Sequence, residues 1–69
     1  MRPNGPAIRA IRRAQKMSLR TLQQKTGLNR GYLSRMERAL IRESADEPVQ
    51  AVASALDVTP DAITHEEKP

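Results

Sequence analysis

The chain has 69 residues, of which 38% are hydrophobic, and it carries 12 Lys+Arg against 8 Asp+Glu for a formal net charge of +4. This composition predicts one small domain with a packed core, and no apolar stretch approaches the roughly 20 residues needed to cross a bilayer. The absence of cysteine excludes disulfides and thiolate metal sites, and with no signal-peptide core at the N-terminus we expect a soluble intracellular protein.

The charge is distributed unevenly along the chain. Residues 1–42 contain eleven basic side chains and one acidic side chain, Glu37, for a net charge of +10, whereas residues 43–69 have a net charge of −6. A one-sided basic field attracts polyanions. It indicates nucleic acid first and an anionic membrane surface second, and an ordinary solvated surface is the less favoured explanation.

A first helix is predicted to begin at Pro6, because a proline suits the opening position of a helix, where no N–H is required. The i, i+3, i+4, i+7 spacing of an amphipathic helix is then occupied by Ile8, Ile11, Arg12 and Gln15. Two of these side chains are polar, so the helix is predicted to carry a charged group on its apolar side.

A second helix is predicted between Ser18 and Gly27. Ser18 is a favoured N-cap, and Met17 and Leu22 have the spacing of a hydrophobic staple around it. Gly27 is expected to end the helix in the left-handed conformation.

A third helix is predicted over residues 29–38, with Asn29 as its N-cap. Its apolar stripe consists of Leu33, Met36, Glu37 and Leu40. Ala39 gives no stop signal, so Leu40 and Ile41 can extend this helix, and a break is expected within residues 42–45.

Two shorter segments complete the predicted elements. A fourth helix is expected to be capped by Ser44 or Asp46, with Pro48 in its first turn and an apolar stripe of Val49, Val52, Ala53 and Leu56. The fifth segment is little more than one turn, with Thr59 as its cap and Pro60 at its first position.

No segment shows the alternation of a β-strand, and no repeat is present. The predicted fold class is therefore all-α. We expect a single compact domain over residues 1–69, with five helices, a core in residues 6–64 and a frayed tail in residues 65–69.

Residues 18–38 carry the pattern that indicates function. Two helices joined by the turn Gly27-Leu28-Asn29 are predicted to form a helix-turn-helix. If the leucines of both helices fill the corner between them, the outer side of the second helix is free, and its N-terminal dipole suits phosphate or base-edge contacts. That outer side presents Arg30, Gly31, Ser34, Arg35 and Arg38.

Residues 8–63 resemble the phage-repressor-like (XRE/Cro-type) helix-turn-helix family. The resemblance implies a five-helix, lambda-repressor-like DNA-binding domain. The matching stretches are Ile8-Arg9, Ile11-Arg12, Met17-Ser18, Leu22, Gly27-Leu28-Asn29, Leu33-Ser34-Arg35-Met36-Glu37-Arg38 and Val52-Ala53-Ser54-Ala55-Leu56-Asp57-Val58-Thr59-Pro60-Asp61.

The resemblance implies that the third helix enters the major groove while the second crosses the phosphate backbone. Carried over by position, the base-reading residues are Asn29, Arg30, Gly31, Ser34 and Arg35. Arginine can bind guanine bidentately through O6 and N7, so Arg30 and Arg35 are the leading candidates.

Contacts to the DNA backbone are predicted from the remaining basic and polar groups of this region. The candidates are Ser18, Arg20, Lys25, Tyr32, Arg38 and Arg42. For Tyr32, the only aromatic residue, packing against the second helix is an equal alternative. Arg9, Arg13 and Lys16 of the first helix are expected to lie on a solvated face rather than to contact DNA.

The chain departs from the family pattern at two positions. Leu19 stands where the family commonly has a glutamine that contacts phosphate, so that role is lost or passes to Arg20. Ala39 stands where a glycine usually ends the recognition helix. The connection over residues 40–47 is also about one residue longer than is usual in the family.

Arg12 and Glu37 both fall on apolar stripes, and a buried charge is tolerated only when it is paired. The sequence therefore predicts an ion pair between Arg12 and Glu37, with a structural role. The family resemblance implies the same pair.

Enzyme chemistry is not predicted. Ser18 and Ser34 have no neighbouring base, His65 is an isolated histidine in the tail, and a domain this small has little volume for a substrate cleft. We expect no catalytic residue, metal, cofactor or small-molecule ligand, and no membrane partner.

The sequence favours a sequence-specific regulator of transcription that binds double-stranded DNA. It would be of Cro-like or repressor type, from a phage or mobile element, acting in the cytoplasm on nucleoid DNA of a bacterial or phage-infected cell. The alternative is an antitoxin or adaptor of the same fold that binds a protein partner through its acidic C-terminal region. A helix that binds membranes or nucleic acid without specificity is a third possibility.

A homodimer on a two-fold operator is a further expectation, with a monomer that binds cooperatively as the alternative. Leu40, Ile41 and residues 58–63 are candidates for the dimer surface. Otherwise Leu40 completes the core and Ile41 is simply exposed.

Overall fold

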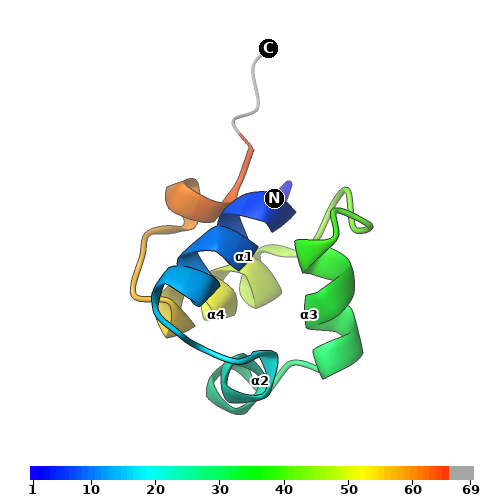
Figure 1. The fold of residues 1–69 in the computed structure, drawn as a ribbon. Helices are drawn as coiled ribbons and strands as arrows, with labels where there is room; N and C mark the ends of the chain where they lie inside the picture. The colour runs from blue at the N-terminus through cyan, green and yellow to red at the C-terminus, as the bar shows by residue number, and fades with distance from the viewer. Residues whose placement is uncertain (66–69) are drawn as a thin grey trace.

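The computed structural model describes residues 1–65 and shows four α-helices followed by one 3₁₀ turn (Figure 1). The elements are α1 (Gly5–Ala14), α2 (Leu19–Thr26), α3 (Arg30–Glu37), α4 (Asp46–Ala55) and the 3₁₀ turn η1 (Pro60–Ile63). The described residues contain no β-strand, only an isolated antiparallel bridge between Pro3 and Thr64. The all-α class is confirmed.

The expectation of five helices is wrong, because the fifth segment makes a single 3₁₀ turn. Its backbone is extended at both flanks, Thr59 and Thr64, so only four residues can coil. The N–H of Ala62 donates to the carbonyl oxygen of Thr59 at 3.0 Å, which is the i→i+3 bond of a 3₁₀ helix. Four residues are too few to continue into the i→i+4 bonds of an α-helix.

The core lies where the four helices and η1 meet. In Figure 1, α1 crosses in front of α4, α2 lies below them and α3 stands at one side. α4 packs against α2 and η1, and α1 packs against α3 and η1. The buried apolar side chains are Ile8, Leu22, Leu33, Met36, Val49, Val52, Ala53, Leu56 and Ile63.

The two ends of the described chain lie side by side. The N–H of Asn4 donates to the carbonyl oxygen of Ile63, and the N–H of His65 donates to that of Arg2, both at 2.8 Å. His65 is therefore held by the N-terminal segment, and the remainder of the predicted frayed tail, residues 66–69, lies outside the described residues.

Three helices begin at polar caps. Ser18 and Asn29 cap α2 and α3 as predicted, and their side chains accept hydrogen bonds from the N–H groups of Thr21 and Gly31. Asn4 caps α1 by accepting from the N–H of Ala7, so that helix begins one residue before Pro6.

The caps predicted for α4 are wrong. Its N-cap residue is Ala45, which makes no side-chain cap bond. Ser44 lies one residue too early, and its hydroxyl is engaged by Tyr32 instead. Asp46 is already the first helical residue.

α3 ends at Glu37, close to the end of the predicted range 29–38, and the extension through Leu40 and Ile41 that the sequence left open does not occur. Ala39 takes a left-handed conformation with φ +61°. The N–H of Leu40 donates to the carbonyl oxygen of Arg35 at 2.9 Å, and that of Ala39 donates to Met36 at 3.2 Å. These two bonds form a Schellman motif, in which Ala39 takes the left-handed position that a glycine usually occupies.

A matched pair of substitutions tests the strain at Ala39. Ala39→Gly removes the steric penalty of a side chain at positive φ, and we expect the free energy of unfolding to rise by about 0.5–1 kcal/mol and Tm by about 2–8 °C. Gly27→Ala is the reverse change, because Gly27 has φ +74° and nothing within 4 Å of an added Cβ. It should lower stability by a similar amount. Thermal melts that move both variants in the same direction would contradict this account.

Candidate nucleic-acid interface

The outer side of α3 is exposed because its apolar side is fixed in the core. Leu33 and Met36 are each 1% exposed, whereas Arg30, Gly31 and Arg35 are exposed. Side chains that lie three or four residues apart along a helix share one of its faces. The residues predicted to read bases therefore share the side of α3 that points away from the core, with Ser34 half-buried at its edge and Asn29 exposed at its start.

Arg35 leans toward the start of α3. Its Nη1 lies 3.6 Å from the position that a Cβ on Gly31 would occupy. Helical side chains slope toward the helix N-terminus, and the missing side chain of Gly31 leaves that path open. The guanidinium of Arg35 consequently lies over the first turn of α3, the same turn that carries Arg30.

The turn before α3 is built from local hydrogen bonds. Gly27 closes α2 in the left-handed region, and its N–H donates to the carbonyl oxygen of Gln23 at 2.8 Å. The Thr26 hydroxyl donates to the carbonyl oxygen of Leu22 and accepts from the N–H of Leu28. These contacts fix the angle at which α3 leaves α2.

Arg12 and Glu37 form a bidentate ion pair between α1 and α3. The Nε of Arg12 donates to Oε2 of Glu37 at 2.6 Å and its Nη2 to Oε1 at 3.0 Å. Its Nη1 donates to the carbonyl oxygen of Met17 at 2.7 Å. The side chains are only 11% and 5% exposed, so the pair fixes α3 on α1 and on the loop that leads into α2.

The backbones of α1 and α3 also approach closely at Gly5, which sequence reasoning did not single out. A Cβ on Gly5 would lie 2.4 Å from the carbonyl oxygen of Met36 and 2.6 Å from that of Glu37. Any other residue would push α1 away from the end of α3. The signal in the sequence was a glycine directly before Pro6, at the start of the helix.

Tyr32 is half-buried and bonded within the domain. Its hydroxyl lies 2.6 Å from the Ser44 hydroxyl. Ser44 in turn pairs with Met1 through two backbone hydrogen bonds. In this position Tyr32 packs against the core and ties α3 to the loop that follows it, and its contact with DNA stays a prediction.

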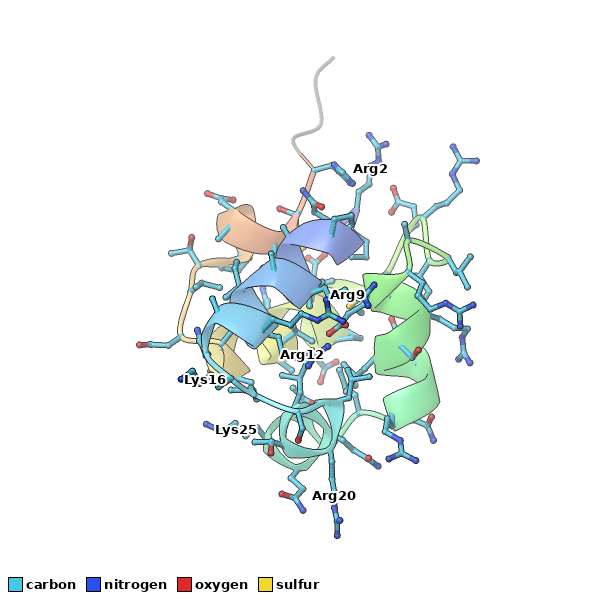
Figure 2. All side chains as sticks on the ribbon, viewed as in Figure 1. Arg2, Arg9, Arg12, Lys16, Arg20 and Lys25 are labelled. Atoms are coloured by element: carbon cyan, nitrogen blue, oxygen red, sulfur yellow. The ribbon has the colours of Figure 1, made fainter. Side chains whose placement is uncertain are left out.

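The other predicted backbone contacts are dispersed. Ser18 uses its hydroxyl on the N–H and the side chain of Thr21. Figure 2 shows Arg20 projecting from α2 away from α1, and Lys25 on the side of α2 that faces away from α3. Arg38 is exposed directly after α3, and Arg42 is exposed in the loop beyond it.

Neither of two other kinds of site is found among residues 1–65. No helix there is both long and apolar enough to span a membrane. No cluster of three or more His, Cys, Asp or Glu side chains in this part of the chain could hold a metal ion.

The sequence model of the helix-turn-helix family matches residues 8–63. The chain is similar to the restriction-modification controller protein C.AhdI from Aeromonas hydrophila, at 33% identity and TM-score 0.77 over 84% of this chain and 86% of that chain. It is similar to SinR, the master regulator for biofilm formation, solved in complex with DNA, at 32% identity and TM-score 0.77 over 83% and 90%. It is also similar to the P22 c2 repressor, solved in complex with a synthetic operator, at 27% identity and TM-score 0.82 over 97% of this chain and 100% of that chain. No curated protein sequence matches the chain.

Removing one member of the ion pair is expected to destabilise the domain. Glu37→Ala leaves the guanidinium of Arg12 buried without its partner, and we expect a loss of about 3–5 kcal/mol. A domain of this size has roughly 3–10 kcal/mol of stability in total, so Tm should fall steeply in a thermal melt monitored by circular dichroism.

The control is the double variant Arg12→Met with Glu37→Leu, which replaces both charges by apolar groups of similar size. It should recover more than half of the loss, because no buried charge remains. A Glu37→Ala variant that melts within about one degree of the wild type would show that the pair contributes no stability.

Proposed function

The chain belongs to the helix-turn-helix family, and from this premise we propose that it is a sequence-specific, double-stranded-DNA-binding regulator of transcription, of Cro-like or repressor type. The observation that carries the proposal is the outward face of α3, which presents Arg30, Gly31 and Arg35 while Leu33 and Met36 are locked in the core. An α-helix of this kind fits the major groove of B-DNA.

The similar structures support this proposal. SinR and the P22 c2 repressor were both solved in complex with DNA, and C.AhdI is a controller of a restriction-modification system. The charge of this chain agrees with such a partner, since residues 1–42 carry a net charge of +10 and DNA is a polyanion.

Base reading is assigned to the first two turns of α3. Arg30 and Arg35 can each bind the O6 and N7 atoms of a guanine, so we expect G·C pairs in each half-site. Gly31 allows the backbone to approach the bases, and Ser34 and the side-chain amide of Asn29 supply further hydrogen-bonding groups.

Backbone contacts are proposed for residues around this face. Arg38 follows α3 directly, and Ser18 and Arg20 stand at the start of α2. Lys25 and Arg42 are proposed as outer contacts. For Tyr32 we propose a positioning role, because its hydroxyl is already bonded to Ser44.

A homodimer on a two-fold operator is part of the proposal, with half-sites about 34 Å apart. Leu40 supports it as an apolar side chain that is 59% exposed. Leu40 therefore does not complete the core. Of the other candidate surface residues, Ile63 is fully buried and Ile41 is half-buried against the core. Such a regulator acts on cytoplasmic DNA of a bacterial or phage-infected cell.

Selection of bound sites from random duplexes at physiological salt tests the function. The wild type should enrich one palindromic sequence with G·C pairs in each half. Arg30→Ala and Arg35→Ala should each weaken binding to that sequence by about 5–150-fold, because a bidentate arginine–guanine contact contributes about 1–3 kcal/mol of discrimination. Each variant should also lose preference at one base pair of the half-site.

Lys25→Ala serves as the control, because it removes one exposed charge from α2 without touching α3. It should weaken binding to selected and scrambled duplexes equally. Equal affinity of the wild type for every duplex would reject specific DNA binding. If the protein instead binds a co-purified protein through its acidic C-terminal region, that result would favour the antitoxin or adaptor alternative.

A further inference from the structure

A crevice of about 390 Å³ opens where α1, α2 and α3 meet. Its rim is formed by Arg9 and Arg13 of α1, Leu19 of α2, Ser34 of α3, and Arg38 directly after α3. Figure 2 shows Arg9 at the boundary between α1 and α3. We call this feature the α1–α3 crevice.

The buried ion pair leaves the α1–α3 crevice with excess positive charge. Arg12 and Glu37 also line it, but they neutralise each other through two hydrogen bonds. Among residues 1–65, no acidic group forms an ion pair with Arg9, Arg13 or Arg38. Three exposed guanidinium groups around one hollow repel each other, and this arrangement suits an anion.

The α1–α3 crevice is continuous with the face that is proposed to read bases. Ser34 belongs to both, and it lies one helical turn from Arg30 and one turn from Arg38. Leu19 is the first residue of α2, and the first N–H groups of a helix have no partner within the helix. The Ser18 side chain accepts only from the N–H of Thr21, so the positive end of α2 adds to the field of the arginines.

A second hollow of about 350 Å³ extends this surface along α1. It is lined by Pro6, Arg9, Ala10, Arg13 and Glu37. Arg9 and Arg13 stand four residues apart on one face of the helix, and both of them line both hollows. The concave surface therefore runs from the start of α2 along α1, beside the outer face of α3.

We propose that the α1–α3 crevice binds a backbone phosphate of the DNA strand that borders the major groove, with Arg9 and Arg13 as its ligands from α1 and Arg38 from α3. This inference rests on the proposed function and extends the DNA interface to α1. It replaces the sequence-based expectation that Arg9 and Arg13 lie on a merely solvated face. The proposal also gives the phosphate contact that Leu19 cannot make to the arginines across the crevice. Arg20 is not assigned this contact, because it is not among the residues that line the crevice.

The test compares Arg9→Gln, Arg13→Gln and the double variant with a matched control, Lys16→Gln. Lys16 carries the same charge on the same segment, but Figure 2 shows it at the end of α1 that lies away from α3. Binding to the selected duplex and to a scrambled duplex is measured by fluorescence anisotropy over a series of salt concentrations. Thermal melts of each variant report folding.

The double variant should lower the slope of log affinity against log salt by about 1–2, because each lost phosphate contact removes about 0.9. Its Kd should rise about tenfold or more, the equivalent of about one charged hydrogen bond. The ratio of affinities for the selected and scrambled duplexes should stay constant, since phosphate contacts carry no sequence information. Tm should be equal to that of the wild type or higher, because repulsion between the arginines is relieved.

Trimming the selected duplex one base pair at a time from its ends gives a second readout. The difference between the wild type and the double variant should vanish once the flanking phosphate has been removed. A salt slope and Kd equal to those of the wild type would overturn the proposal, as would an equal loss in Lys16→Gln. If the wild type itself shows no preference between duplexes, the proposed function fails, whatever the crevice variants do.

Discussion

The buried pair of Arg12 and Glu37 is the contact on which the orientation of α3 depends. It joins α1 to α3 through two hydrogen bonds and reaches the loop before α2 through a third. A charge this deeply buried is tolerated only with its partner in place, so few other arrangements of the helices satisfy both groups. The close approach of α1 and α3 at Gly5 adds a steric constraint at the end of α3. Together with the buried Leu33 and Met36, they decide which side of α3 faces outward.

The same pair shapes the electrostatics of the surface. Glu37 is the only acidic residue among the first 42, and its charge is neutralised inside the domain by Arg12. The remaining basic side chains of residues 1–42 therefore meet no acidic side chain from their own segment. Folding places several of them on α3 and around the α1–α3 crevice, next to the positive ends of α2 and α3. The contact that stabilises the fold thus also leaves the side proposed to face DNA strongly positive.

The sequence predicted those parts of the fold that depend on neighbouring residues. Ser18, Asn29 and Gly27 act through their own turn of backbone, and each has the role that was expected of it. The stripes of α1 and α3 also identified the ion pair, since an unpaired charge in a core is too unfavourable to persist.

The wrong predictions have different physical causes. Ala39 is held at positive φ although nothing in its own residue type favours that conformation. Ser44 does not cap α4 because Tyr32, twelve residues earlier, bonds its hydroxyl. Arg9 and Arg13 are exposed, as a solvated helix face requires, and the crevice that they line forms only where α1, α2 and α3 meet. The outer face of α3 could be predicted because helical spacing alone defines it, whereas the α1–α3 crevice depends on tertiary packing and could not be predicted from the sequence.

The most direct measurement of the central claim is an NMR titration of the isotopically labelled protein with its selected duplex, following backbone amide shifts. The orientation of α3 described above predicts the largest changes at the start of α2 and along Asn29–Arg38, with smaller ones on α1 near Arg9 and Arg13. The amides of α4 and η1 should be nearly unperturbed. Changes centred on the acidic α4 and η1 surface, with α3 unaffected, would contradict it.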